Sequence, residues 1–147
     1  MDLEFAMEGV KTNEAYPLRC AESEEPSNSE ALILPGSIGR NSKPLMALDW
    51  FPMIEAILSE RRSHVPAGEI SARFHNALAE SVVMIAKKSG HRHVVLSGGC
   101  FQNRYLTERT IVRLREAGFN PYWHQRVPPN DGCIALGQIA AIRRTTR

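Results

Sequence analysis

One stretch of the sequence decides the fold: His93-Val-Val-Leu96-Ser97-Gly98-Gly99-Cys100-Phe101-Gln102-Asn103. The apolar run at its start predicts a buried strand by its β-branched content, and the glycines predict a turn into a helix. Glycine has no Cβ, so the backbone at 98 and 99 can take positive φ angles and approach a ligand closely. A strand, a glycine turn and a helix start suit an anion such as a phosphate, because unpaired N–H groups point outward there.

A second motif follows: Arg126-Val-Pro-Pro-Asn-Asp131-Gly-Cys-Ile-Ala-Leu-Gly137-Gln138. It predicts another turn that presents the carboxylate of Asp131 at a helix start, where the helix dipole stabilises an anion. Asn130 or Asp131 can equally be the N-cap of that helix. A binding role and a capping role for Asp131 therefore both stay open.

The rest of the chain predicts helices that alternate with strands. Apolar periodicity and end signals predict helices over residues 3–9, 52–60, 69–89, 103–117 and 131–143, and short apolar runs predict strands over 31–34, 48–50, 93–96 and 119–123. In the last helix, Ile134, Ile139 and Ala140 are expected to face inward. Residues 11–30 are polar and acidic and predict a surface loop. We expect an N-terminal helix and acidic flexible loop over 1–30, and an α/β lobe with some parallel strand pairing over 31–147.

Composition excludes several classes of protein. The chain has 147 residues, of which 43% are hydrophobic and 23% charged, which is ordinary for a soluble domain. Its net charge of +2 is too small to argue for nucleic acid. No apolar run approaches the ~20 residues that span a bilayer. The 3 cysteines lack the spacing of a disulfide framework or a zinc finger. We expect a cytoplasmic protein with neither a nucleic-acid nor a membrane partner.

The two motifs together resemble the C-terminal part of the HypF carbamoyltransferases of nickel-iron hydrogenase maturation. The segment Ile70-Ser-Ala-Arg-Phe-His-Asn-Ala-Leu-Ala-Glu80 fits the helix before the glycine turn in that family. The resemblance covers nearly the whole chain, most closely residues 48–142. It implies an actin-like lobe (ASKHA superfamily, Kae1-like), a small mixed sheet flanked by helices, similar to the tRNA threonylcarbamoyltransferase.

The resemblance also implies an activity. Enzymes of the family make carbamoyl-adenylate from carbamoyl phosphate and ATP, and then pass the carbamoyl group to the C-terminal cysteine of the partner protein HypE. By this resemblance the adenylate binds the glycine turn and the amides after it: Ser97, Gly98, Gly99, Gln102 and Asn103. The alternative for the glycine turn is a tight strand-to-helix connection that binds no ligand. Asn103 can equally cap the following helix.

Other residues are candidates for catalysis, metal binding or contact with phosphate. His75 is our candidate catalytic residue, with a structural histidine as the alternative. In the family, an aspartate placed like Asp131 completes a divalent metal site (iron or zinc) with a His-x-x-x-His motif. This chain has no histidines at that spacing, so its metal site looks incomplete. Cys100 and Cys133 are interpreted as small packing residues. Arg104 and Arg126 are candidate contacts to phosphate or carbamoyl.

Two other interpretations stay open beside a working carbamoyltransferase. Actin-like folds bind nucleotide between two lobes, and this chain supplies about one. It therefore needs a second lobe or subunit for turnover, or it is a non-catalytic nucleotide-binding or docking module. Another carbamoyltransferase or a kinase of the same superfamily is the remaining alternative.

Overall fold

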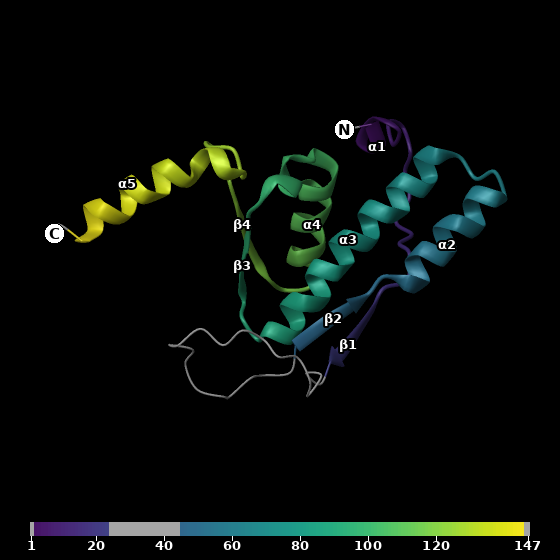
Figure 1. Cartoon of the computed structure of the whole chain (residues 1–147), viewed down its shortest axis with the longest axis horizontal. Coiled ribbons are helices and arrows are strands. Elements are labelled where there is room, and N and C mark those ends of the chain that lie inside the picture. The colour runs from purple at the N-terminus through teal and green to yellow at the C-terminus, as the bar shows by residue number, and fades with distance from the viewer. Residues whose placement is uncertain (1, 24–44, 146–147) are drawn as a thin grey trace, which may run out of the picture.

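The longest helix, α3 (Ala67–Ser89), runs through the centre of the molecule (Figure 1). The computed structural model describes residues 2–23 and 45–145, so the strand predicted over residues 31–34 lies outside it. Helix α3 confirms the helix predicted over 69–89 and begins two residues earlier. It ends where Gly90 takes the left-handed conformation at φ 71°, a common way to close a helix.

Helix α4 (Arg104–Glu116) packs against α3, and the strands β3 (His93–Leu96) and β4 (Asn120–Trp123) lie beside them. The two strands are parallel, with Val95 opposite Tyr122 and Leu96 opposite Trp123. The main core joins α3, β3 and α4 through Val83, Ala86, Leu96, Ile111 and Leu114.

In the described structure, the other face of the β3–β4 sheet is uncovered. Successive side chains point to opposite faces of a strand. Leu96 is 2% exposed and faces the core, whereas Val95 is 72% and Tyr122 53% exposed. The prediction of a buried strand is therefore wrong at Val95, because only one face of this sheet is covered by α3 and α4 in the described structure.

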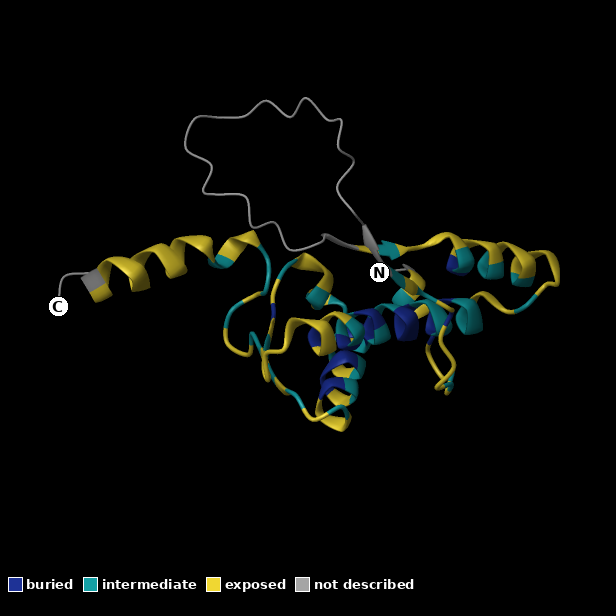
Figure 2. Ribbon diagram, turned by 90° about the horizontal axis from the view of Figure 1, so that it is seen from below, coloured by how far each residue is buried: buried dark blue, intermediate teal, exposed yellow. Residues whose placement is uncertain are grey.

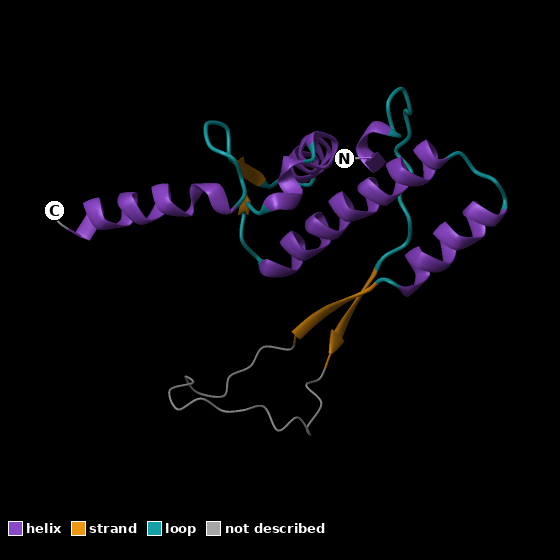
Figure 3. Ribbon diagram, turned by 45° about the horizontal axis from the view of Figure 1, so that its top comes forward, coloured by secondary structure: helices purple, strands orange, loops and turns teal. Residues whose placement is uncertain are grey.

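A second region lies at the other side of α3. Strand β1 (Arg19–Ser23) pairs antiparallel with β2 (Leu45–Asp49), and α2 (Phe51–Arg62) packs on α3. A smaller core of Tyr16, Met53 and Ala77 joins α2 and α3 to the segment that precedes β1. Because β1 lies inside the predicted loop 11–30, that loop prediction is wrong for residues 19–23. The α/β class is confirmed, although the described strands form two separate pairs rather than one mixed sheet (Figure 3).

The two ends of the described chain differ in how they pack. Helix α1 (Asp2–Phe5) is shorter than predicted, since residues 6–9 form a turn that closes at Gly9 with φ 82°. At the other end, a 3₁₀ turn (Asp131–Cys133) leads into α5 (Ile134–Thr145), which projects from the body (Figure 1). None of the described helices has the length and apolar character that crossing a bilayer requires.

Helix α5 exposes the apolar side chains that were expected to face inward. Ile134 is 55% and Ile139 58% exposed, and Ala140 is exposed as well. Figure 2 shows the contrast between this exposed helix and the buried faces of α3 and α4. The inward prediction is wrong because α5 extends away from the core instead of folding back over the bare sheet.

Candidate functional site

A cavity of about 590 Å³ lies where α1, α3 and the start of α4 meet. Its volume falls within the range of small-molecule sites, roughly 300–1,000 Å³. Four of the predicted site residues lie in its wall: His75, Gly99, Gln102 and Asn103. The other lining residues are Glu4, Phe5, Leu78, Cys100 and Leu106.

The glycine turn and the second motif meet at one hydrogen bond. The N–H of Gly98 donates to the carbonyl of Pro129 at 2.7 Å, which places the Pro-Pro-Asn-Asp turn against the end of β3. Gly98 has φ 105° and ψ 158°, a conformation that favours glycine. Ser97, just before it, has its Oγ 3.3 Å from Nε2 of His124. Ser97 and Gly98 thus lie beside the cavity rather than in its wall.

Gly99 plays a different part from its neighbour. The sequence allows positive φ angles at both glycines, but among the described residues Gly99 is not one of those with positive φ. It begins a 3₁₀ turn, Gly99–Gln102, and a Cβ added there would meet open space. Within the described structure, no acceptor takes the N–H of Gly99 or Cys100. Both residues line the cavity, and each has a free backbone N–H donor.

His75 is buried in the cavity wall, 4% exposed, with a partner on each ring nitrogen. Nδ1 lies 2.8 Å from the carbonyl oxygen of Ser71, which only accepts, so Nδ1 carries the proton. Nε2 then accepts from Nδ2 of Asn103 at 2.9 Å. This neutral tautomer follows from the hydrogen-bond network. With both nitrogens engaged, the imidazole holds Asn103 in place, and proton transfer by His75 stays a prediction.

Asn103 is the N-cap of α4, which settles one of the two roles left open for it. Its Oδ1 accepts from the N–H of Leu106 at 2.8 Å, the usual geometry of a helix cap. Its Nδ2 has two hydrogens and uses one on His75. The second hydrogen leaves room for a ligand contact, so binding by Asn103 stays a prediction.

Asp131 is exposed, and Asn130 takes the capping role beside it. Oδ1 of Asn130 accepts from the N–H of Gly132 at 3.0 Å, and Asp131 does not line the cavity. Within residues 2–23 and 45–145, no group of three or more His, Cys, Asp or Glu side chains is arranged to hold a metal. Within the described chain, Asp131 is therefore not part of a complete set of metal ligands.

Glu4 is a charged lining residue that the sequence did not indicate. Its Oε1 accepts from the N–H of Arg104 at 2.8 Å and lies 3.4 Å from the N–H of Tyr105. The two partners are 100 and 101 positions away, so no local pattern could have signalled the contact.

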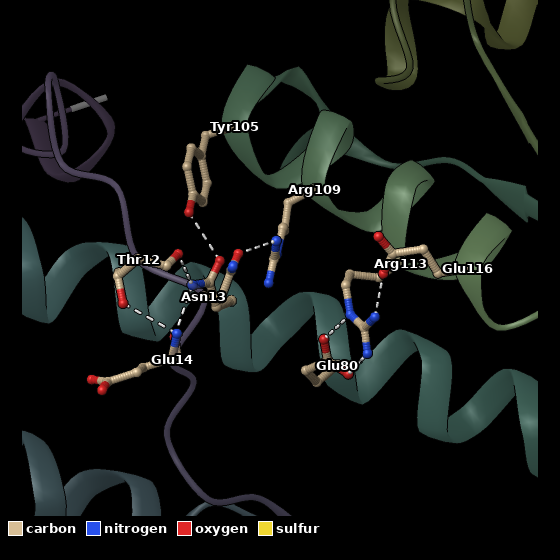
Figure 4. Close-up of polar contacts among 9 residues, drawn as sticks. Thr12, Asn13, Glu14, Glu80, Tyr105, Arg109, Arg113 and Glu116 are labelled. Atoms are coloured by element: carbon tan, nitrogen blue, oxygen red, sulfur yellow. Dashed lines mark hydrogen bonds and ion pairs between the residues drawn. The ribbon is translucent and has the colours of Figure 1, made fainter.

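Residues 12–14, which come after α1 and its turn, are fixed to α3 and α4 by polar contacts (Figure 4). Nη1 of Arg109 donates to Oδ1 of Asn13 at 2.9 Å. Further along α4, Arg113 pairs with Glu80 of α3 and with Glu116. The hydrogen bond from Arg113 holds the pKa of Glu80 below its ordinary value, against the opposing effect of burial.

The class of protein follows from comparison with known sequences and structures. A family described as "Carbamoyltransferase, Kae1-like Domain, second subdomain" matches residues 1–138. The carbamoyltransferase HypF of Synechocystis sp. is 46% identical over 101 residues, which are 69% of this chain and 13% of that protein. HypF2 of Cupriavidus necator is 37% identical over 98 residues, which are 66% of this chain and 12% of that protein.

A solved structure agrees with the sequence relatives. Full-length HypF, in its phosphate- and nucleotide-bound form, matches 93% of this chain with a TM-score of 0.73 and 31% identity. The match spans 16% of that protein. The chain belongs to the HypF carbamoyltransferase family and corresponds to the second subdomain of its Kae1-like domain. The resemblance inferred from the glycine turn and the Asn-Asp-Gly motif is confirmed.

Proposed function

We propose that this chain supplies part of a carbamoyltransferase that uses carbamoyl-adenylate. In this proposal, the carbamoyl group passes to the C-terminal cysteine thiol of a HypE-like protein during nickel-iron hydrogenase maturation. The observation that carries it is the cavity of about 590 Å³ beside the glycine turn. Further support comes from the relative solved with phosphate and nucleotide bound.

The chemistry is acyl transfer from a mixed anhydride. The acceptor thiolate attacks the carbamoyl carbon, so a C–S bond forms and the C–O bond to the adenylate phosphate breaks. AMP leaves with the bonding electron pair, and the thiol proton passes to solvent. The free N–H groups of Gly99 and Cys100 bind the phosphate oxygens, the amides of Gln102 and Asn103 orient the nucleotide, and His75 holds Asn103.

The resemblance implies a divalent metal, iron or zinc, whose chemistry would be to polarise a carbonyl. The described residues do not fit such a site by themselves, because Asp131 belongs to no group of three or more His, Cys, Asp or Glu side chains that could hold a metal. We propose that a second lobe or subunit completes both the cleft and any metal site. The chain spans 13% of the Synechocystis relative, which leaves ample sequence for that role.

The alternative is a docking module without turnover. It is favoured by one observation, the exposed apolar side chains of α5. A folded chain that binds neither AMP nor ATP would support this alternative.

Calorimetric titration with AMP and ATP, with and without Zn²⁺, tests the proposal. Gly99→Arg places a long side chain into the cavity without backbone strain, since its Cβ meets open space. Gly137→Arg is the matched control, because a Cβ there also meets open space but on α5. We expect binding to the original chain and to Gly137→Arg, and none to Gly99→Arg. Equal binding by all three would contradict this site.

Asp131→Ala separates the metal from the nucleotide. We expect this variant to bind AMP as the original chain does and to lose any effect of Zn²⁺ on that binding. A Zn²⁺ effect that survives the substitution would remove Asp131 from the proposed metal site.

A further inference from the structure

We infer that Glu4 is a positioning residue: its carboxylate fixes the first turn of α4, and with it the ligand-binding segment Gly99–Asn103. The inference rests on the proposed nucleotide site and adds to it a residue of the N-terminal segment. Glu4 itself lines the cavity, together with Gly99, Gln102 and Asn103.

The carboxylate acts on N–H groups that a helix cannot satisfy alone. The first N–H groups of an α-helix have no partner within the helix. In α4, Glu4 accepts from Arg104 and Tyr105, while Asn103 accepts from Leu106. Two side chains from distant parts of the sequence therefore complete one helix end. A negative charge at this end is also favoured by the helix dipole.

The backbone of α1 is held so that Glu4 reaches this place. Oγ of Ser71 donates to the carbonyl of Leu3 at 2.5 Å. Gly68 of α3 allows the close approach, since a Cβ there would clash with the carbonyl of Ala6. Met7, 4% exposed, anchors the following turn. The position of Glu4 is thus set by α3, which also carries His75.

The carboxylate also determines where a phosphate can bind. A helix N-terminus is an ordinary anion site, but here Glu4 occupies it. The phosphate of a nucleotide is therefore directed to the free N–H groups of Gly99 and Cys100, at the other end of the same segment. If the carboxylate of Glu4 instead competed with the phosphate for the same site, removing Glu4 would tighten nucleotide binding.

The experiment uses the full chain, AMP as the probe, and two readouts: calorimetric affinity and amide hydrogen exchange. Glu4→Ala should weaken AMP binding roughly five- to tenfold and speed exchange at Arg104 and Tyr105. Glu4→Gln should restore most of the affinity, because its amide oxygen accepts from the same N–H groups. Glu8→Ala is the matched control, an exposed glutamate on the same segment, and should change neither readout.

Gly68→Ala tests the inference without touching Glu4. The added methyl group displaces α1 and should reproduce the loss of affinity, and combining it with Glu4→Ala should add little further loss. Should Glu4→Ala fail to fold, the comparison of Glu4→Gln with the shorter Glu4→Asp gives the same information. We then expect only the glutamine variant to keep its affinity.

Three outcomes would overturn the inference. Tighter AMP binding by Glu4→Ala would mean that the carboxylate competes with the ligand. Unchanged affinity with faster exchange would mean a purely structural cap. If the original chain binds no AMP, the proposed function fails, and the inference then depends on amide hydrogen exchange alone. In that case, unchanged exchange across Gly99–Asn103 in Glu4→Ala overturns the inference. Faster exchange across Gly99–Asn103 supports it.

Discussion

Replacing Asn103 by alanine removes an amide that makes two hydrogen bonds, one that caps α4 at Leu106 and one that joins α4 to His75 of α3. The lost cap on Leu106 costs about 1 kcal/mol. Nε2 of His75 is left without its donor in a side chain that is 4% exposed, which costs about 1–3 kcal/mol. We expect the free energy of unfolding to fall by about 2–4 kcal/mol.

Urea denaturation followed by circular dichroism measures this loss, and a second variant divides it. Asn103→Asp keeps an oxygen for the cap but lacks the N–H donor for His75. It should lose only the second part, about 1–3 kcal/mol. Asn120→Ala, at an exposed asparagine on β4, is the control and should stay within about 0.5 kcal/mol of the original chain.

The reasoning fails if Asn103→Ala behaves like the Asn120→Ala control. It fails in part if the aspartate variant loses as much as the alanine variant, since the cap would then contribute nothing. A double-mutant cycle with His75→Phe checks the assigned pair, because Asn103→Ala should cost less once the ring nitrogen is gone.

Three further predictions concern other parts of the molecule. Leu114→Ala, at 0% exposure in the main core, should lower the free energy of unfolding by about 2–5 kcal/mol in urea, and a loss below about 1 kcal/mol would contradict the assigned core. Glu80→Gln should destabilise the folded protein at neutral pH, because Arg113 depresses the pKa of Glu80 in the folded state. The stabilisation by the ionised Glu80 is complete above its unfolded-state pKa of about 4.3 and is lost as the pH falls through its lower folded-state pKa. Denaturation across a pH series checks it, and a difference between the two proteins that persists at the lowest pH would refute it. Ile139→Glu combined with Ile142→Glu should leave stability within about 0.5 kcal/mol but reduce self-association in light scattering, because both side chains are more than half exposed, at 58% and 64%.

Local sequence patterns predicted the elements whose side chains pack within the described chain. The apolar spacing in α3 and the closing Gly90 predicted this helix correctly. The prediction succeeded because α2 and α4, which pack against α3, cover its apolar side chains. Strand β1 gave no such signal. Its segment Arg-Cys-Ala-Glu-Ser has no alternation of apolar side chains, and its structure comes from backbone pairing with β2.

The errors in burial have one physical origin. Val95 and Ile139 have the residue types of a core, and the sequence pattern contains no information on whether a partner surface is present. Parallel sheets are generally covered on both faces, so an exposed Val95 marks a surface that the described residues do not complete. The exposed apolar side chains of α5 likewise mark a surface that the described residues do not cover.

The sequence predicted the part of the candidate site whose residues lie within recognisable sequence motifs. Gly99, Gln102 and Asn103 lie in one short motif, and His75 lies on a helix that the same family pattern includes; all four line the cavity. Glu4 reaches the cavity from the far end of the chain, and neither spacing nor composition records such a contact. The tautomer of His75 was equally hidden, because it depends on Ser71 and Asn103 together.

The long separation between Glu4 and α4 also bears on the order of folding. Closing a loop of 100 residues carries an entropy cost that contacts along α3 and α4 do not carry, since those helices meet across a much shorter chain. We therefore expect the α3–α4 core to form first and the N-terminal segment to dock last. The cavity would then be assembled in the final step of folding and be the first part to open.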